Sequence, residues 1–177
     1  HNKLNVLVAA HCFTDAVHAR GKNKLFVDHF QWIKFLGKIS EKTNYNWFIK
    51  LHPSQYENNY FKMQKLINIF PKFKLLPKNK SNIDLLDEIN VVLTVYGSVA
   101  TEYPLFGIPV LNASNNGPYK DAKFCYNFLS LKNYKKAIFN LQKFKVRKNS
   151  SKEIFEFVGA RNMLNYHFFG YKDGNYF

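Results

Sequence analysis

The sequence predicts an α/β fold in which a parallel sheet of about five to six strands carries helices on both faces. Short apolar runs rich in β-branched residues alternate with segments whose apolar residues recur at helical spacing. The clearest unit is Val91–Asn112, where an apolar run ends in Gly97-Ser98, a short helical piece follows, and a second apolar run begins after Gly107. This order of strand, turn, helix and strand is typical of a parallel sheet with crossover helices.

The predicted strands are short and apolar, as expected for strands that are buried on both faces. In chain order they are Leu4–Ala10, Trp47–Leu51, Phe73–Leu76, Val91–Val95 and Ile108–Leu111. Five such strands separated by helical patterns predict a Rossmann-like three-layer sandwich.

The predicted helices follow from apolar spacing and from signals at their starts. Apolar residues at helical intervals predict a helix from Phe26 to about Lys42. Pro53 suits the turn before, or the first position of, a second helix that runs to about Ile69. Ser81 followed by Asp84 resembles a capping box, which predicts a short helix through Leu85, Leu86 and Ile89.

The whole chain is expected to form a single domain. It has 177 residues, of which 46% are apolar and 18% aromatic, enough to bury a sizeable core. Residues 121–177 are expected to close the fold with two helices, Asn133–Phe144 and Ser151–Phe168.

The charge of the chain indicates anionic partners. The formal net charge is +14, although Lys far outnumbers Arg and a compositional bias accounts for part of this excess. Nucleotide phosphates, a lipid-phosphate acceptor and an anionic membrane bound peripherally remain candidates. Nucleic acid is not expected as a partner, because three arginines are too few for the residue that usually reads base edges.

Cysteine usage and hydropathy predict a cytoplasmic protein. Cys12 and Cys125 show no ligand spacing, and a chain of this size needs no disulfide. No apolar run approaches the roughly 20 residues of a membrane span, and no signal peptide is visible. The inner face of the cytoplasmic membrane is the alternative location. Because the chain starts at His1 rather than Met, further domains are expected beyond it.

Candidate site residues lie where the predicted strands end. Ligands of open parallel sheets bind beyond the carboxyl ends of the strands. The chemically capable residues at these ends are His11, Asp15, His52, Lys78, Tyr96, Gly97 and Ser98. His11 and Asp15 could hydrogen-bond a phosphate or a sugar. A metal ion is not expected, since neither ligand spacing nor a carboxylate pair suits one.

Gly97, Ser98 and Glu102 form the strongest set. Gly97 permits a tight turn, the NH groups after Ser98 can bind phosphate, and Glu102 lies one helical turn later, where its carboxylate can bind a sugar diol. The alternative is that Ser98 is an ordinary N-cap and Glu102 a solvated helix residue.

His52 follows the second strand, in Lys50-Leu51-His52-Pro53. An imidazole at this place can donate a hydrogen bond to a phosphate oxygen or protonate a leaving phosphate. The alternative is a histidine that caps the strand end without a role in binding.

Four segments in order resemble a known family. They are Lys50–Pro53, Leu85–Thr94, Gly97–Glu102 and Phe106–Val110. Together they resemble the carboxyl-terminal, nucleotide-binding domain of bacterial glycosyltransferases with the GT-B fold. The likeness is to enzymes of capsule and surface-polysaccharide synthesis, including Kdo-transferase-like and sialyltransferase-like groups with a His-Pro motif.

The resemblance implies a role for each matching residue. His52, as catalytic residue, would contact the donor phosphate and stabilise it as it leaves, with Gly97 and Ser98 as a further phosphate-binding turn. Glu102 would hold the ribose, and Lys78 would lie near the base. The donor is then a nucleotide-sugar and the acceptor a glycan or lipid-linked molecule, with no cofactor. The acceptor site would lie on an amino-terminal domain, so residues 1–177 would be half of a two-domain enzyme.

Several other functions fit the same features. A CDP-polyol phosphotransferase or a nucleotide-sugar epimerase would share the His-Pro and Gly-Ser segments. A non-catalytic Rossmann-type binding module and a basic nucleic-acid-binding domain are the non-enzymatic alternatives, and both rank below the transferase.

Overall fold

The computed structural model describes residues 3–14, 25–54, 56–115 and 119–168. Six parallel strands form one sheet in the order β3-β2-β1-β4-β5-β6. The strands are β1 Asn5–Ala9, β2 Asn46–Lys50, β3 Phe73–Leu75, β4 Val91–Thr94, β5 Val110–Asn112 and β6 Tyr126–Asn127. The order reverses between β1 and β4, which is the place where a doubly wound sheet opens a crevice. The predicted α/β, Rossmann-like sandwich is confirmed.

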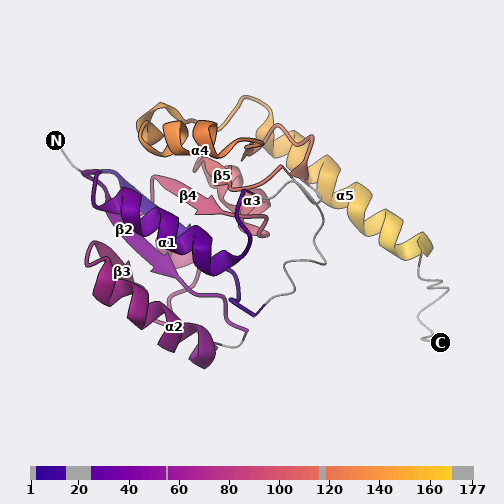
Figure 1. The fold of residues 1–177 in the computed structure, drawn as a ribbon. Helices are drawn as coiled ribbons and strands as arrows, with labels where there is room; N and C mark the ends of the chain where they lie inside the picture. The colour runs from indigo at the N-terminus through magenta and orange to yellow at the C-terminus, as the bar shows by residue number, and fades with distance from the viewer. Residues whose placement is uncertain (1–2, 15–24, 55, 116–118, 169–177) are drawn as a thin grey trace.

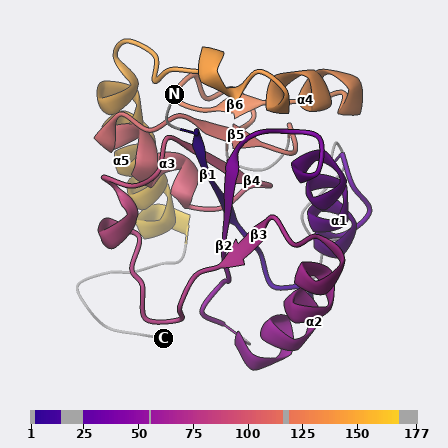
Figure 2. The same ribbon diagram turned by 90° about the vertical axis from the view of Figure 1, so that its left-hand side faces the viewer.

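Helices cover both faces of the sheet (Figures 1 and 2). They are α1 His29–Ser40, α2 Tyr56–Ile69, α3 Val99–Glu102, α4 Leu131–Ile138 and α5 Ser150–Phe168. Figure 2 shows α1 and α2 on one side of the sheet and α3 and α5 on the other. Short 3-10 turns are found at Ile83–Leu85, Tyr103–Phe106 and Leu141–Lys143.

Alternation along the strands divides the core into two clusters. In β1, Val6 and Val8 pack with residues of α1, α2 and α4, whereas Leu7 packs on the other face with α3 and α5. The first cluster includes a hydrogen bond from Trp32 Nε1 to the hydroxyl of Tyr134 at 3.1 Å, which joins α1 to α4 within the core.

Three predicted elements differ in detail. The helix expected through Ile89 is only the 3-10 turn Ile83–Leu85, although the capping box that opens it is present. The helix expected over Asn133–Phe144 begins earlier, at Leu131, because Ser130 caps it by accepting a hydrogen bond from the Asn133 NH. It also ends earlier, at Ile138, and a separate 3-10 turn follows at Leu141–Lys143. Residues 121–177 are not helices alone, since they also contain β6, which is too short to leave an apolar pattern.

Candidate functional site

A cavity of about 330 Å³ lies at the carboxyl ends of the strands. Its walls come from β1, from β2 and the segment after it, from the first residue of α2, from the loop after β3, and from the start of α3. The lining residues are Ala9, Ala10, Lys50, Leu51, His52, Pro53, Tyr56, Lys78, Asn82, Ser98 and Val99. Three of the residues predicted from sequence, His52, Lys78 and Ser98, therefore line a common cavity.

The alternation of β2 explains how Lys50 reaches this cavity. Trp47 and Ile49 belong to the core beneath α1 and α2, so Phe48 and Lys50 lie on the opposite face. Leu51 returns to the first core, and His52 follows two residues after Lys50. Both side chains line the cavity as a result.

The imidazole of His52 is exposed and held through one ring nitrogen. Its Nδ1 accepts a hydrogen bond from the Ser54 NH at 3.1 Å, and the Cys12 Sγ lies 3.5 Å from the same nitrogen. Because an amide NH can only donate, Nδ1 carries no proton in this arrangement, and in the neutral ring the proton resides on Nε2. His52 can therefore donate a hydrogen bond from Nε2.

Glu102 is bonded to two residues of the cavity wall. The Ser98 Oγ donates to Glu102 Oε1 at 2.7 Å, and the Asn82 Nδ2 donates to Glu102 Oε2 at 2.8 Å. Ser98 occupies the N-cap position of α3 without making a side-chain capping hydrogen bond, and Glu102 is half-buried. Glu102 itself lies outside the cavity lining and orders two residues within it.

The expected helix dipole at Ser98 is small. The α-helical part is the single turn Val99–Glu102, and the chain continues as the 3-10 turn that contains Pro104. One turn aligns few peptide dipoles, so any anion binding here depends on side chains more than on a helix end.

Two lysines with different surroundings line the cavity. Lys78 is exposed, lies 3.5 Å from a Glu57 carboxylate oxygen, and has its ammonium 4.8 Å from the centre of the Tyr56 ring. Lys50 is half-buried and donates to the carbonyl oxygen of Lys80. Burial lowers the pKa of Lys50, and the charge of Asp84 offsets part of this effect.

His11 and Tyr96 do not line the cavity; they belong to a packed cluster. The His11 ring stacks on His29 with centroids 4.5 Å apart, and the Tyr96 hydroxyl is 3.1 Å from His29 Nε2. His11 Nε2 accepts from the backbone NH groups of Val95 and Tyr96, each at 3.4 Å. His11 thereby joins the end of β1 to the end of β4. Asp15 lies outside the described residues.

Gly97 lies in a tightly packed place, and its φ is not in the positive range that favours glycine. A Cβ at this position would lie 3.0 Å from Thr94 Oγ1 and 3.7 Å from a carbon of the His11 ring. The glycine with a positive φ in the described part of the chain is instead Gly107, at 79°, which ends the 3-10 turn before β5. The feature that the structure shows at Gly97 is therefore close packing beside Thr94, and not a turn that needs a positive φ.

Among the lining residues whose side chains carry a polar or charged group, sequence reasoning missed three: Lys50, Tyr56 and Asn82. For Lys50 a usable signal existed, since it precedes His52 by two residues and an extended chain places such residues on one face. Tyr56 and Asn82 come from a helix start and from a loop, where spacing alone does not indicate direction.

The described residues contain no group of three or more His, Cys, Asp or Glu side chains placed to hold a metal ion. Within the same residues, no helix has the length and apolar character needed to cross a membrane.

The sheet order defines a Rossmann-like α/β domain of the doubly wound type, and the cavity lies at the carboxyl edge, where such domains bind ligands. No protein-family model matches the chain, and no curated protein matches its sequence. Solved structures match its fold. Staphylococcus aureus MnaA in its UDP co-structure aligns with a TM-score of 0.57 and 14% identity, covering 94% of this chain and 47% of MnaA.

A second similar structure is a Listeria monocytogenes protein assigned as a UDP-N-acetylglucosamine 2-epimerase. Its TM-score is 0.55 at 16% identity, over 99% of this chain and 47% of the Listeria protein. The chain thus spans about half the length of both proteins. At such identities the likeness establishes a shared fold, in keeping with the GT-B-type domain that the sequence resemblance implies.

Proposed function

We propose that this chain is the nucleotide-binding half of a nucleotide-sugar-dependent glycosyltransferase of bacterial capsular or surface polysaccharide synthesis. The observation that carries the proposal is the cavity itself. It brings His52 from the end of β2, Lys78 from the loop after β3 and Ser98 from the start of α3 to one place. Cationic and hydrogen-bond-donating groups that converge at the carboxyl edge of a parallel sheet suit a phosphate-bearing ligand.

Each group has a part in the proposed reaction. An acceptor hydroxyl attacks the anomeric carbon of the sugar and gives up its proton to a base on the second domain. The bond from that carbon to the phosphate oxygen breaks, and negative charge grows on the departing nucleotide phosphate. His52 donates from Nε2 to this oxygen, a preorganised donor placed where charge develops. Glu102 lies outside the cavity lining, where Ser98 and Asn82 fix its carboxylate, and the lone pairs left on its oxygens would accept from ribose hydroxyls that extend past the cavity wall.

The rest of the enzyme is part of the proposal. A second domain would supply the acceptor site for a glycan or lipid-linked molecule, in the cytoplasm or at the inner face of its membrane. The twofold greater length of the two similar proteins supports such a domain. We propose no metal ion and no cofactor.

A nucleotide panel on this chain tests the proposal. Titration calorimetry with UDP, CDP, CMP and GDP should find one ligand that binds, and at 100 times its Kd it should stabilise the fold by about 2.7 kcal/mol. Glu102→Ala should weaken that ligand about tenfold or more, because hydrogen bonds to a charged group contribute about 1.5–3 kcal/mol. Thr101→Ala, one residue away, is the matched control. Absence of binding by any nucleotide, or equal affinity in Glu102→Ala, would sink the proposal.

A nucleotide-sugar epimerase is the second candidate, favoured by the assignment of the Listeria protein and by the UDP held in MnaA. The full-length enzyme separates the two. An epimerase converts a UDP-sugar without any acceptor, whereas a glycosyltransferase releases nucleotide only as product forms. Product mass also distinguishes a CDP-polyol phosphotransferase, since that reaction leaves a phosphodiester in the product.

A further inference from the structure

Lys50 occupies a position in the cavity that sequence reasoning did not assign. It is the last residue of β2, it lies on the sheet face opposite Ile49, and its side chain lines the cavity together with His52 and Ser98. A lysine at the end of a strand is usually free to extend into solvent, but Lys50 is half-buried and turned toward the cavity wall.

The ammonium of Lys50 is not neutralised by a carboxylate. Within the described residues, no Asp or Glu oxygen lies within 4.0 Å of its Nζ, whereas Lys78 lies 3.5 Å from Glu57. Burial lowers the pKa of Lys50, which means that folding disfavours its charged form. A partly desolvated cation without a counter-ion favours the binding of an anion.

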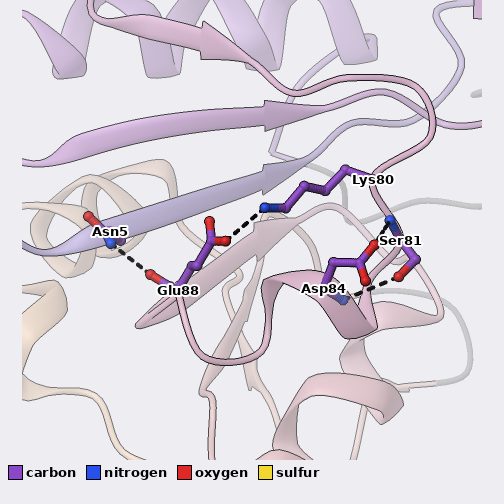
Figure 3. A network of polar contacts seen from close by, with 5 residues as sticks. All are labelled: Asn5, Lys80, Ser81, Asp84 and Glu88. Atoms are coloured by element: carbon purple, nitrogen blue, oxygen red, sulfur yellow. Dashed lines mark hydrogen bonds and ion pairs between the residues drawn. The ribbon is translucent and has the colours of Figure 1, made fainter.

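The loop that contacts this cation is itself braced by polar contacts, which Figure 3 shows. The Lys80 carbonyl accepts one hydrogen bond from Lys50. The Lys80 ammonium is 2.7 Å from a Glu88 carboxylate oxygen, and the Glu88 carbonyl accepts from Asn5 Nδ2 at 2.7 Å. The loop that presents the Lys80 carbonyl is thereby tied to the strand β1.

A reciprocal pair of hydrogen bonds fixes the same loop just after Lys80, where the 3-10 turn Ile83–Leu85 begins. The Ser81 NH donates to the Asp84 carboxylate at 2.7 Å, and the Asp84 NH donates to Ser81 Oγ at 3.2 Å. Hydrogen bonding with Ser81 lowers the pKa of Asp84, so this carboxylate is charged at neutral pH and contributes a distant attraction on Lys50. One N–H of the Lys50 ammonium is used by Lys80, which leaves two for a ligand.

We propose that Lys50 is a phosphate-binding residue of the cavity, with two of its N–H groups directed to the oxygens of a phosphate or diphosphate group. The proposal deepens the proposed function and rests on it only for the identity of the ligand as a nucleotide. The requirement for an anion comes from the placement of Lys50 itself.

The test compares Lys50→Met with the wild-type chain, using inorganic pyrophosphate, the best-binding nucleotide and its nucleoside as probes. Lys50→Met should weaken pyrophosphate and the nucleotide by about 10- to 100-fold, the range for losing hydrogen bonds from a charged donor. The nucleoside should bind both forms alike. Lys74→Met is the matched control, since it removes the same charge from an exposed side chain of β3 that lies over Phe48, outside the cavity.

Two further measurements, a melting temperature and the pyrophosphate affinity of a second variant, separate an effect on binding from an effect on folding. Lys50→Met should melt at the wild-type temperature or above, because it removes a cation that folding disfavours, and Lys50→Arg should keep pyrophosphate affinity within a few-fold. Equal pyrophosphate and nucleotide binding in Lys50→Met overturns the Lys50 proposal and leaves the proposed function intact. If pyrophosphate binds in a way that depends on Lys50 but no nucleotide binds, the proposed function is overturned and the Lys50 proposal stands. A wild-type chain that binds neither probe overturns both.

Discussion

Two regions at the carboxyl edge of the sheet look alike in sequence and differ in structure. In the first, β2 is followed by His52, whose imidazole is exposed in the wall of a cavity. In the second, β1 is followed by His11, which is only 9% exposed and is stacked on His29. Both histidines follow a buried strand, but one can meet a ligand and the other joins two strands.

The difference comes from what surrounds each ring. The ends of β1 and β4 lie side by side, so the backbone NH groups of Val95 and Tyr96 reach His11 Nε2. The end of β2 adjoins β3, which is only three residues long, and the chain leaves the cavity open beside it. A polar side chain at the end of a strand is therefore a candidate for ligand binding only where groups at the end of the neighbouring strand do not already hydrogen-bond to it.

The largest expected effect contrasts the two histidines directly. His11→Ala should lower the free energy of unfolding by about 2–3 kcal/mol, because it removes ring packing and leaves the NH groups of Val95 and Tyr96, just after β4, without an acceptor. His52→Ala should change it by less than about 0.5 kcal/mol, since the side chain is exposed. Urea unfolding followed by circular dichroism measures both. Equal losses in the two variants would contradict the contrast between a structural and a ligand-facing histidine.

The second-largest expected effect is a loss of stability on substitution of Gly97, which packs beside His11 and Thr94. Gly97→Ala should destabilise the chain by roughly 1–2 kcal/mol, because the new methyl group would lie 3.0 Å from Thr94 Oγ1. Adding Thr94→Ala removes the crowded atom, so the double variant should lose less than the sum of the single losses. Thermal unfolding of the four forms completes the cycle. Strictly additive losses would show that Gly97 is needed for another reason.

The same contrast explains which parts were predictable. The strands β1 to β5 could be predicted from sequence because each lies in a short apolar run, as in Val91–Thr94, whose four residues are all buried. The two-residue strand β6 could not, since two residues carry no periodicity. Single-domain organisation over residues 1–177 and an amino-terminal partner domain stay predictions.

Some of the residues that line the cavity could be predicted from the sequence for a related reason. His52, Lys78 and Ser98 were found because residues that follow parallel strands gather at one edge, but the same rule also selected His11 and Tyr96, which are packed together. Whether one of these residues faces a cavity depends on the path of the neighbouring loops. The spacing of residues in the sequence does not predict that path. Lys50 was missed because it belongs to the strand itself.

Lys78 gives the smallest expected effect and sharpens the comparison within the cavity. It is exposed, and its charge is already engaged by Glu57 and by the Tyr56 ring, whereas that of Lys50 is not. Exposed ion pairs contribute about 0–1 kcal/mol, so Lys78→Met should weaken nucleotide binding by only about two- to threefold. Glu57→Gln should strengthen it slightly, because Lys78 is then released toward the ligand. Calorimetry at low and at high salt checks both variants, since each change should shrink as salt screens exposed charges. A tenfold loss in Lys78→Met would instead make Lys78, and not Lys50, the main cation of the cavity.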